Sequence, residues 1–367
     1  MNPWIRRSVA TLTRHVDGQL LAAVGALMAL GLIAIFSASD MNLARVSAQL
    51  LNMLVALGVL YAFANIPPHY LARLGLPLYV LGVLLLICVA LFGDVVHGAR
   101  RWLQVGVTRI QPSELMKIAV PLMLAWYFDR YEATLRLKNY IIASILLVIP
   151  VALIVRQPDL GTALLIFAAG CYVLFLAGLS WRIIIGLAIA GAACLPFLWS
   201  AMHDYQRERI LTLLDPTQDP LGAGYHAIQS TIAVGSGGLV GKGWLQGTQT
   251  HLDFIPERTT DFIFAVYAEE FGLLGNMLLL FLFLLVIARG VVITANAPTL
   301  FTRLFGGAIT LTFFTYAFVN MGMVSGILPV VGVPLPLVSY GGTSLVTICL
   351  GLGILMSIQT HKKLVQS

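Results

Sequence analysis

The sequence predicts an all-α polytopic membrane protein of about ten transmembrane helices. Of its 367 residues, 59% are hydrophobic and 10% are charged, whereas soluble domains carry roughly 25% charged residues. Apolar runs of about 20 residues, the length that spans a hydrocarbon core, recur along the chain. Only residues 202–261 form a long polar interruption, which we expect to be a large extracytoplasmic loop between the seventh and eighth helices. Residues 1–367 are therefore predicted to form a single integral membrane domain.

The apolar runs place the helices in order along the chain. The first run follows several arginines and resembles a signal peptide, but it is longer than the about 7–15 apolar residues of such segments, so we expect a retained helix. The fifth run is short and contains Pro150, which makes its limits uncertain. The expected spans are 19–38, 46–66, 74–93, 112–128, 140–155, 160–178, 183–201, 262–288, 303–327 and 342–359.

Basic residues bear on the orientation of these spans. An even number of spans puts both termini on one side, and an excess of Lys and Arg marks the cytoplasmic face. If both termini are placed in the cytoplasm, the excess of Lys and Arg on the cytoplasmic side is small, because the short outer segment 94–111 is itself basic. Positive charge kept on the outer face indicates an anionic ligand there. The alternative is an inverted orientation.

The long loop contains two recognisable segments. Residues 224–234 are predicted to form a short amphipathic helix on the membrane surface. The sequence GSGGLVGKG (235–243) is expected to be a flexible glycine-rich turn. It lacks the GxxxxGK[ST] spacing of a phosphate-binding P-loop, so ATP binding is not predicted.

Glu114 and Lys117 are charged residues inside the fourth predicted span. Such residues are costly in a membrane and are candidates for function. Their i, i+3 spacing puts them on one helix face, where they can pair. The pair either fixes helix packing or lets Lys117 hold a phosphate as a point charge.

Asp159 is the charged residue of a second polar stretch, RQPDLGT, at the start of the sixth span. An aspartate at this position is favoured as a helix N-cap on local grounds alone.

Asp261 comes just before the eighth span, after Thr259 and Thr260. Either threonine can cap this helix, which would place Asp261 in its first turn. The helix dipole would lower the pKa of Asp261, and desolvation would raise it. Such a carboxylate is able to act as a general base on a sugar hydroxyl, although residue type alone favours helix capping. Glu269 and Glu270 lie about two turns deeper, and at least one of them must face protein or water rather than lipid.

Residues 326–344 contain several prolines and glycines between the last two spans. Non-helical backbone at membrane depth is tolerated where protein or a cavity satisfies its polar groups, so we expect a re-entrant loop lining a site. Ser339 and Tyr340 would offer hydroxyl groups there. The alternative is a tight connector.

Several long motifs together resemble the SEDS family of bacterial cell-wall polymerases, most closely its cell-elongation branch. The resemblance covers essentially the whole chain, and its motifs are far more specific than any single short pattern. The matching stretches are GARRWL (98–103), QPSELMKIA (111–119), QPDLGT (157–162), LTLLDPTQDPLGAGYHAIQS (211–230), GSGGLVGKGWLQGTQT (235–250), PERTTDFIFAVYAEEFG (256–272) and VGVPLPLVSYGGTS (331–344).

This resemblance implies a peptidoglycan glycosyltransferase that polymerises lipid II at the outer face of the bacterial cytoplasmic membrane. The essential aspartate of the family falls on Asp261, and the motif residues of QPSE-x-x-K and GARRW fall on Glu114, Lys117, Arg101 and Trp102. Members work with a class B penicillin-binding protein, a transpeptidase. No nucleic-acid partner is indicated.

The implied reaction needs a base for the acceptor hydroxyl, which we expect to be Asp261, and positive charge for the pyrophosphate leaving group. The expected basic residues are Arg101, Arg109, Lys117, Arg207, Arg209, Lys242 and Arg258, and the other expected substrate-binding residues are Glu114, Trp102, Asp159, Ser339 and Tyr340. A divalent cation (Mg or Mn) could share the second role, but no sequence feature requires a cofactor. The alternatives are a lipid II flippase and a non-enzymatic scaffold of the elongation complex.

Overall fold

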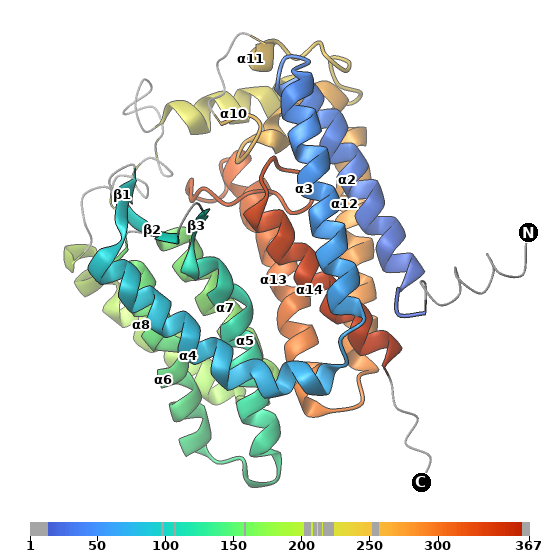
Figure 1. The fold of residues 1–367 in the computed structure, drawn as a ribbon. Coiled ribbons are helices and arrows are strands. Elements are labelled where there is room, and N and C mark those ends of the chain that lie inside the picture. The colour runs from blue at the N-terminus through green and yellow to red at the C-terminus, as the bar shows by residue number, and fades with distance from the viewer. Residues whose placement is uncertain are drawn as a thin grey trace, which may run out of the picture.

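The computed structural model describes residues 14–96, 99–105, 108–157, 159–201, 224–251 and 257–361, and the single residues 207, 211 and 215. Within these residues, each predicted span coincides with a helix (Figure 1). The helices are α2 (Gly18–Ala38), α3 (Leu43–Ala64), α4 (Pro68–Phe92), α5 (Pro112–Arg130), α6 (Leu137–Val155), α7 (Leu160–Leu176), α8 (Trp181–Ala201), α12 (Ile263–Ala295), α13 (Leu300–Val324) and α14 (Thr343–Thr360).

The helices have the composition of a multi-pass membrane protein. By length and hydropathy, seven of the described helices are able to cross a membrane, and α7 and the apolar part of α8 are shorter. The helix α5 is more polar because it carries Glu114, Lys117 and Asp129. Pro150 lies within α6 and is buried, so the uncertain fifth span is one continuous helix. The predicted all-α polytopic fold is confirmed.

The helix α13 occupies the centre of the bundle. In Figure 1, the helices α4 to α8 gather on one side, and α2, α3, α12 and α14 gather on the other. The helix α13 contacts α5 and α7 of the first group and α12 and α14 of the second. Side chains on α13 can therefore reach polar groups carried by both halves of the bundle.

The helix α12 is kinked at Gly272, whose φ is 62°. The kink is filled by the glycine-rich turn 235–243. A Cβ added to Gly241 would lie 2.0 Å from the carbonyl oxygen of Glu270, so no larger residue fits there. The backbone N–H of Leu273 donates to the carbonyl of Gly238 at 2.9 Å. The predicted flexible turn is thus packed tightly against a helix.

The other elements at this end of the bundle are a small sheet and two helices (Figure 1). The basic segment 94–111, predicted to be a short outer loop, contains the antiparallel strands β1 (Asp94–Val96), β2 (Ala99–Val105) and β3 (Thr108–Ile110). The predicted amphipathic helix is present as α10 (Tyr225–Ser236), which packs on α12 and α13, and is followed by the single turn α11 (Thr248–His251).

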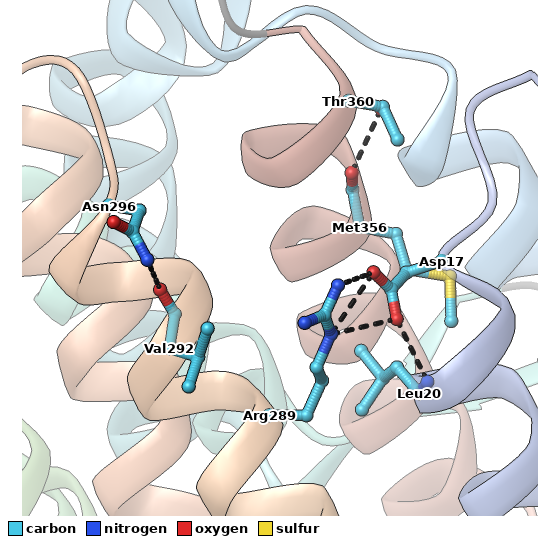
Figure 2. A network of polar contacts seen from close by, with 7 residues as sticks. All are labelled: Asp17, Leu20, Arg289, Val292, Asn296, Met356 and Thr360. Carbon is cyan, nitrogen blue, oxygen red and sulfur yellow. Dashed lines mark hydrogen bonds and ion pairs between the residues drawn. The ribbon is translucent and has the colours of Figure 1, made fainter.

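An ion pair closes the opposite end of the bundle (Figure 2). Asp17 caps α2 by accepting from the backbone N–H of Leu20 at 2.9 Å, and it also accepts from Arg289 of α12 at 2.5 Å. Beside this pair, the rings of His15 and His361 stack with centroids 4.3 Å apart. The first and last described helices therefore meet at one end, as an even number of spans requires.

Candidate functional site

Asp261 lies in a turn that precedes α12, not inside the helix. The helix begins at Ile263 without a side-chain cap, so the prediction that Thr259 or Thr260 caps it is wrong. The hydroxyl of Thr260 instead donates backwards to the carboxylate of Glu257 at 2.9 Å. Thr259 is buried against other elements. The charge of Asp261 is therefore not part of the first helical turn.

Three consecutive carbonyl groups hold this turn in place. The carbonyl of Thr259 accepts from the backbone N–H of Tyr340 at 2.9 Å. The carbonyl of Thr260 accepts from the hydroxyl of Ser339 at 2.6 Å, and that of Asp261 accepts from the side-chain amide of Asn320 at 2.8 Å. The backbone that presents Asp261 is thus fixed by residues from α13 and from the segment before α14.

The segment between α13 and α14 is non-helical, as predicted, and α3 satisfies part of its backbone. Gln49, which is fully buried, donates to the carbonyl of Ser339 at 3.3 Å and accepts from the N–H of Gly341 at 3.2 Å. The hydroxyl of Ser339 accepts from the N–H of Leu335 at 2.8 Å. Backbone of this kind persists inside a membrane protein only with such partners.

A cavity of about 210 Å³ lies between this segment and the Asp261 turn. The predicted cavity is therefore present, and a tight connector is not what forms. A carboxylate oxygen of Asp261 lies 3.2 Å from the position that a Cβ on Gly332 would occupy, and Gly332 has a φ of +76°. The lining residues are Thr260, Asp261, Pro334, Leu335, Leu337, Ser339, Tyr340, Gly341, Thr343, Ser344, Leu345 and Ile348.

The surroundings of Asp261 shift its acidity. Burial raises the pKa of Asp261 to about 6, and the negative charge of Glu257 acts in the same direction. Of the two opposing effects expected from the sequence, desolvation dominates. A carboxylate with this pKa is mostly ionised at neutral pH and accepts a proton more readily than an ordinary aspartate.

A second polar cluster lies between α5, α13 and α14. Lys117, which is buried, pairs with Glu114 at 2.5 Å, as predicted. The hydroxyl of Thr347 donates to the other carboxylate oxygen of Glu114 at 3.3 Å, and the Lys117 ammonium lies 5.4 Å from the centre of the Tyr316 ring. A buried charge that is both paired and hydrogen-bonded is tolerated at this depth.

Asp159 begins α7 beside this cluster. One of its oxygens accepts from the backbone N–H of Thr162 at 3.3 Å, which confirms the predicted N-cap. The other accepts from the side chain of Gln111 at 3.3 Å. Asp159 therefore joins the start of α7 to the residue that precedes α5.

The two polar regions are neighbours. Ile348 lines the Asp261 cavity and also a smaller apolar cavity of about 40 Å³ beside Lys117. Tyr316 and Asn320 stand one turn apart on α13, so they share a helix face. One of them contacts Lys117, and the other contacts the backbone of Asp261.

Most of the basic residues expected to bind phosphate already have partners within the protein. Lys242 pairs with the fully buried Glu269 at 2.7 Å, and Arg258 pairs with Asp40 at 2.5 Å. Arg101 donates to a backbone carbonyl at 3.4 Å and Arg207 to two carbonyls, at 2.9 and 2.8 Å. Their role towards a phosphate stays a prediction.

For the other residues expected to bind substrate, the structure describes only part of their surroundings. Trp102 lies on β2 opposite Asp94 of β1. Arg109 lies on β3 opposite Gln104, and only its backbone position is described. Arg209 lies outside the described residues, as does much of the loop 202–261.

Glu269 and Glu270 are both buried, so both face protein, whereas the sequence required this of at least one of them. A carboxylate oxygen of Glu269 accepts from Lys242, from the hydroxyl of Thr248 at 3.1 Å and from the N–H of Gln249 at 3.0 Å. Glu270 accepts from the hydroxyl of Ser37 on α2. These carboxylates fasten the end of the long loop and α2 to α12.

A family model described as "Cell cycle protein", which groups FtsW, RodA and SpoVE, matches residues 18–364. The chain belongs to this family. The "Peptidoglycan glycosyltransferase MrdB" of Escherichia coli is 51% identical over 351 residues, 95% of each chain. The predicted SEDS resemblance is thereby confirmed.

Solved structures of the FtsW/RodA/SpoVE family share this fold. One, described as "Structural coordination of polymerization and crosslinking by a peptidoglycan synthase complex", contains a chain that is 34% identical, with a TM-score of 0.82, and the match covers 95% of this chain and 99% of that one. The crystal structure of RodA from Thermus thermophilus is 29% identical, with a TM-score of 0.71, and the match covers 94% and 96%.

Three polar residues of the site were not predicted from the sequence: Gln49 and Asn320, which hold backbone near Asp261, and Tyr316, which contacts Lys117. Each is an uncharged polar residue inside an apolar span, and polar groups at such positions are costly unless they have partners. The same principle, applied to amides and phenols, would have selected all three.

In the part of the chain that the structure describes, no group of three or more His, Cys, Asp and Glu residues could hold a metal ion.

Proposed function

We propose that this family member is a peptidoglycan glycosyltransferase that polymerises lipid II during cell elongation, with Asp261 as the general base. The enzyme class is supported by the name of the 51% identical relative. The role of Asp261 is supported by one observation above all: its carboxylate, with a pKa raised to about 6, lines a cavity while its backbone is held by Asn320.

In the proposed reaction, the 4-hydroxyl oxygen of the acceptor GlcNAc forms a bond to the anomeric carbon of the donor MurNAc. The bond from that carbon to undecaprenyl pyrophosphate breaks, and the pyrophosphate leaves with the electron pair. Asp261 takes the hydroxyl proton. A base is most effective when its pKa lies near the working pH, and burial brings Asp261 closer to neutrality than an ordinary aspartate.

Positive charge must offset the charge on the pyrophosphate leaving group. Lys117 is a candidate for this role, because it is buried next to a small cavity that shares Ile348 with the Asp261 cavity. Lys117, Lys242 and Arg258 are each paired with a carboxylate, which each would have to exchange for phosphate. A divalent cation, Mg²⁺ or Mn²⁺, would when bound supply further positive charge to the leaving group.

The proposed location is the bacterial cytoplasmic (inner) membrane, with both termini in the cytoplasm and the cavity on the periplasmic side. The start of α2 and the end of α14 lie at the same end of the bundle, which supports placing both termini on one side of the membrane. The proposed partner is a class B penicillin-binding protein. Its support is the structural neighbour, whose description names a peptidoglycan synthase complex that coordinates polymerisation and crosslinking.

Reconstitution separates this proposal from its alternatives. The purified chain and its transpeptidase partner are placed in liposomes with lipid II, and both glycan polymer and lipid movement between leaflets are measured. The proposal expects polymer. Lipid movement without polymer would establish the flippase instead, and neither activity would indicate a scaffold.

A further inference from the structure

Asn320 is a fully buried amide in the apolar helix α13. Its nitrogen donates two hydrogen bonds, to the carbonyl of Asp261 at 2.8 Å and to the carbonyl of Val333 at 2.7 Å. Its side-chain oxygen is buried without a hydrogen-bond partner among the described residues. Only the donor end of the amide is used, so the two N–H groups account for an amide at this position.

The two carbonyls that Asn320 holds belong to the Asp261 turn and to the segment next to the Asp261 carboxylate. The first is the backbone of Asp261 itself. The second is in Val333, which directly follows Gly332, and a Cβ on Gly332 would lie 3.2 Å from a carboxylate oxygen of Asp261. One side chain therefore sets both the backbone that carries the carboxylate and the segment against which it packs.

Among the residues that the structure describes, no backbone N–H donates to the carbonyl of Asp261 in place of this contact. The carbonyl of Glu257 takes the N–H groups of Thr260 and Phe262, and α12 begins only at Ile263. The neighbouring carbonyls of Thr259 and Thr260 are held from the segment before α14. Asn320 is thus the link from the Asp261 turn to the central helix.

We propose that Asn320 is a positioning residue for glycosyl transfer, which holds the Asp261 carboxylate at the angle and depth that the acceptor hydroxyl requires. The inference rests on the proposed function, because it takes Asp261 to be the base. Asn320 lies outside the residues that line the cavity and acts through Asp261. Small displacements of a reacting group lower rates by up to about a hundredfold.

Asn320→Leu tests the proposal, because it keeps the approximate size of the side chain and removes both donors. Asn139→Leu is the matched control: Asn139 is also buried and donates to a loop carbonyl, that of Thr134 at 3.2 Å, but it lies at the start of α6, away from the cavity. Polymerisation of lipid II is measured as kcat, KM and the pH midpoint of kcat, together with thermal unfolding.

We expect Asn320→Leu to lower kcat by about ten- to a hundredfold with KM changed less than about threefold, and to move the pH midpoint. Asn320→Gln, which keeps the donors, should recover part of kcat. Asn139→Leu should lower the unfolding temperature and leave kcat and the midpoint unchanged. A native kcat and midpoint in Asn320→Leu, or equal losses of kcat in both leucine variants, would overturn the proposal.

Gly332→Ala provides a second route if Asn320→Leu does not fold. Gly332 is exposed, and a Cβ there would lie 3.2 Å from an Asp261 carboxylate oxygen. Because alanine at a φ of +76° also strains the backbone, thermal unfolding is measured together with kcat. The same loss of kcat and shift of midpoint are expected, and native values would count against the proposal. Asp261→Asn is measured in parallel: if it polymerises normally, the proposed function fails, whereas an inactive Asp261→Asn with a native Asn320→Leu refutes only the positioning role.

Discussion

The hydroxyl of Ser339 donates to the carbonyl oxygen of Thr260 at 2.6 Å and so joins residues 79 positions apart. One partner lies in the segment before α14, and the other lies in the turn before α12. These are the two walls of the cavity that contains Asp261. The cavity is therefore assembled by long-range contacts, and its shape depends on few hydrogen bonds.

Ser339→Ala should weaken the cavity walls. The change leaves the carbonyl of Thr260 and the N–H of Leu335 without the partner they share, and a buried group left unsatisfied costs about 1–3 kcal/mol. We expect a lower unfolding temperature and reduced polymerisation. Ser339→Thr keeps the hydroxyl and should retain more of both, and a fully stable, fully active alanine variant would show that the contact is dispensable.

The pH dependence of the reaction should reflect the raised pKa of Asp261. The base works when ionised, so kcat/KM should fall about tenfold per pH unit below about pH 6 and reach a plateau above it. Glu257→Gln removes a negative charge that helps raise this pKa, so the midpoint should move to lower pH. Burial, the larger cause, remains, and the midpoint should stay above the ordinary aspartate value of 3.8. A midpoint that Glu257→Gln moves upward would contradict this description.

The Glu114–Lys117 pair should show the behaviour of a buried ion pair. Removing one partner leaves a buried charge uncompensated, which costs on the order of 3 kcal/mol, whereas removing both is far less harmful. Glu114→Gln alone should therefore destabilise the protein more than Glu114→Gln combined with Lys117→Met. Thermal unfolding of the two single variants and the double variant tests this, and simply additive losses would show that the pair is not coupled.

The glycine-rich turn offers a test of packing with an internal control. Gly241→Ala places a Cβ 2.0 Å from the carbonyl oxygen of Glu270 at a φ of +82°, and should destabilise the protein strongly. Gly235→Ala lies in α10 with nothing within 4 Å of its Cβ, and alanine favours a helix. It should leave the unfolding temperature unchanged or raise it. Equal effects of the two changes would support the flexible turn predicted from the sequence.

Much of the fold follows from local sequence patterns. Apolar runs locate the helices, the i, i+3 spacing pairs Glu114 with Lys117, and Asp159 caps α7 as local preference dictates. The predicted family is confirmed by the match over residues 18–364, and the predicted enzyme class agrees with the name of the E. coli relative.

The surroundings of Asp261 could not be derived in the same way. Thr260 has the residue type of a helix cap, but it bonds back to Glu257 and the helix starts later. Asn320 and Gln49 hold groups 59 and 290 positions away, which no local pattern reveals. The sheet at 94–110 was not predicted, because two of its three strands have only three residues and show no clear alternation. The packing of the glycine-rich turn was not predicted either, because its partner is the kink of α12 at Gly272.

The role of Asp261 as the base is the central claim, and one comparison tests it most directly. Native protein, Asp261→Asn and Asp261→Glu are reconstituted with the transpeptidase partner, supplied with lipid II and followed through the first rounds of polymerisation. If Asp261 is the base, Asp261→Asn should bind lipid II as the native protein does and polymerise it at least about a hundredfold more slowly. Asp261→Glu should keep partial activity with an altered pH midpoint. Glycan polymer formed by Asp261→Asn at the native rate would contradict this role of Asp261.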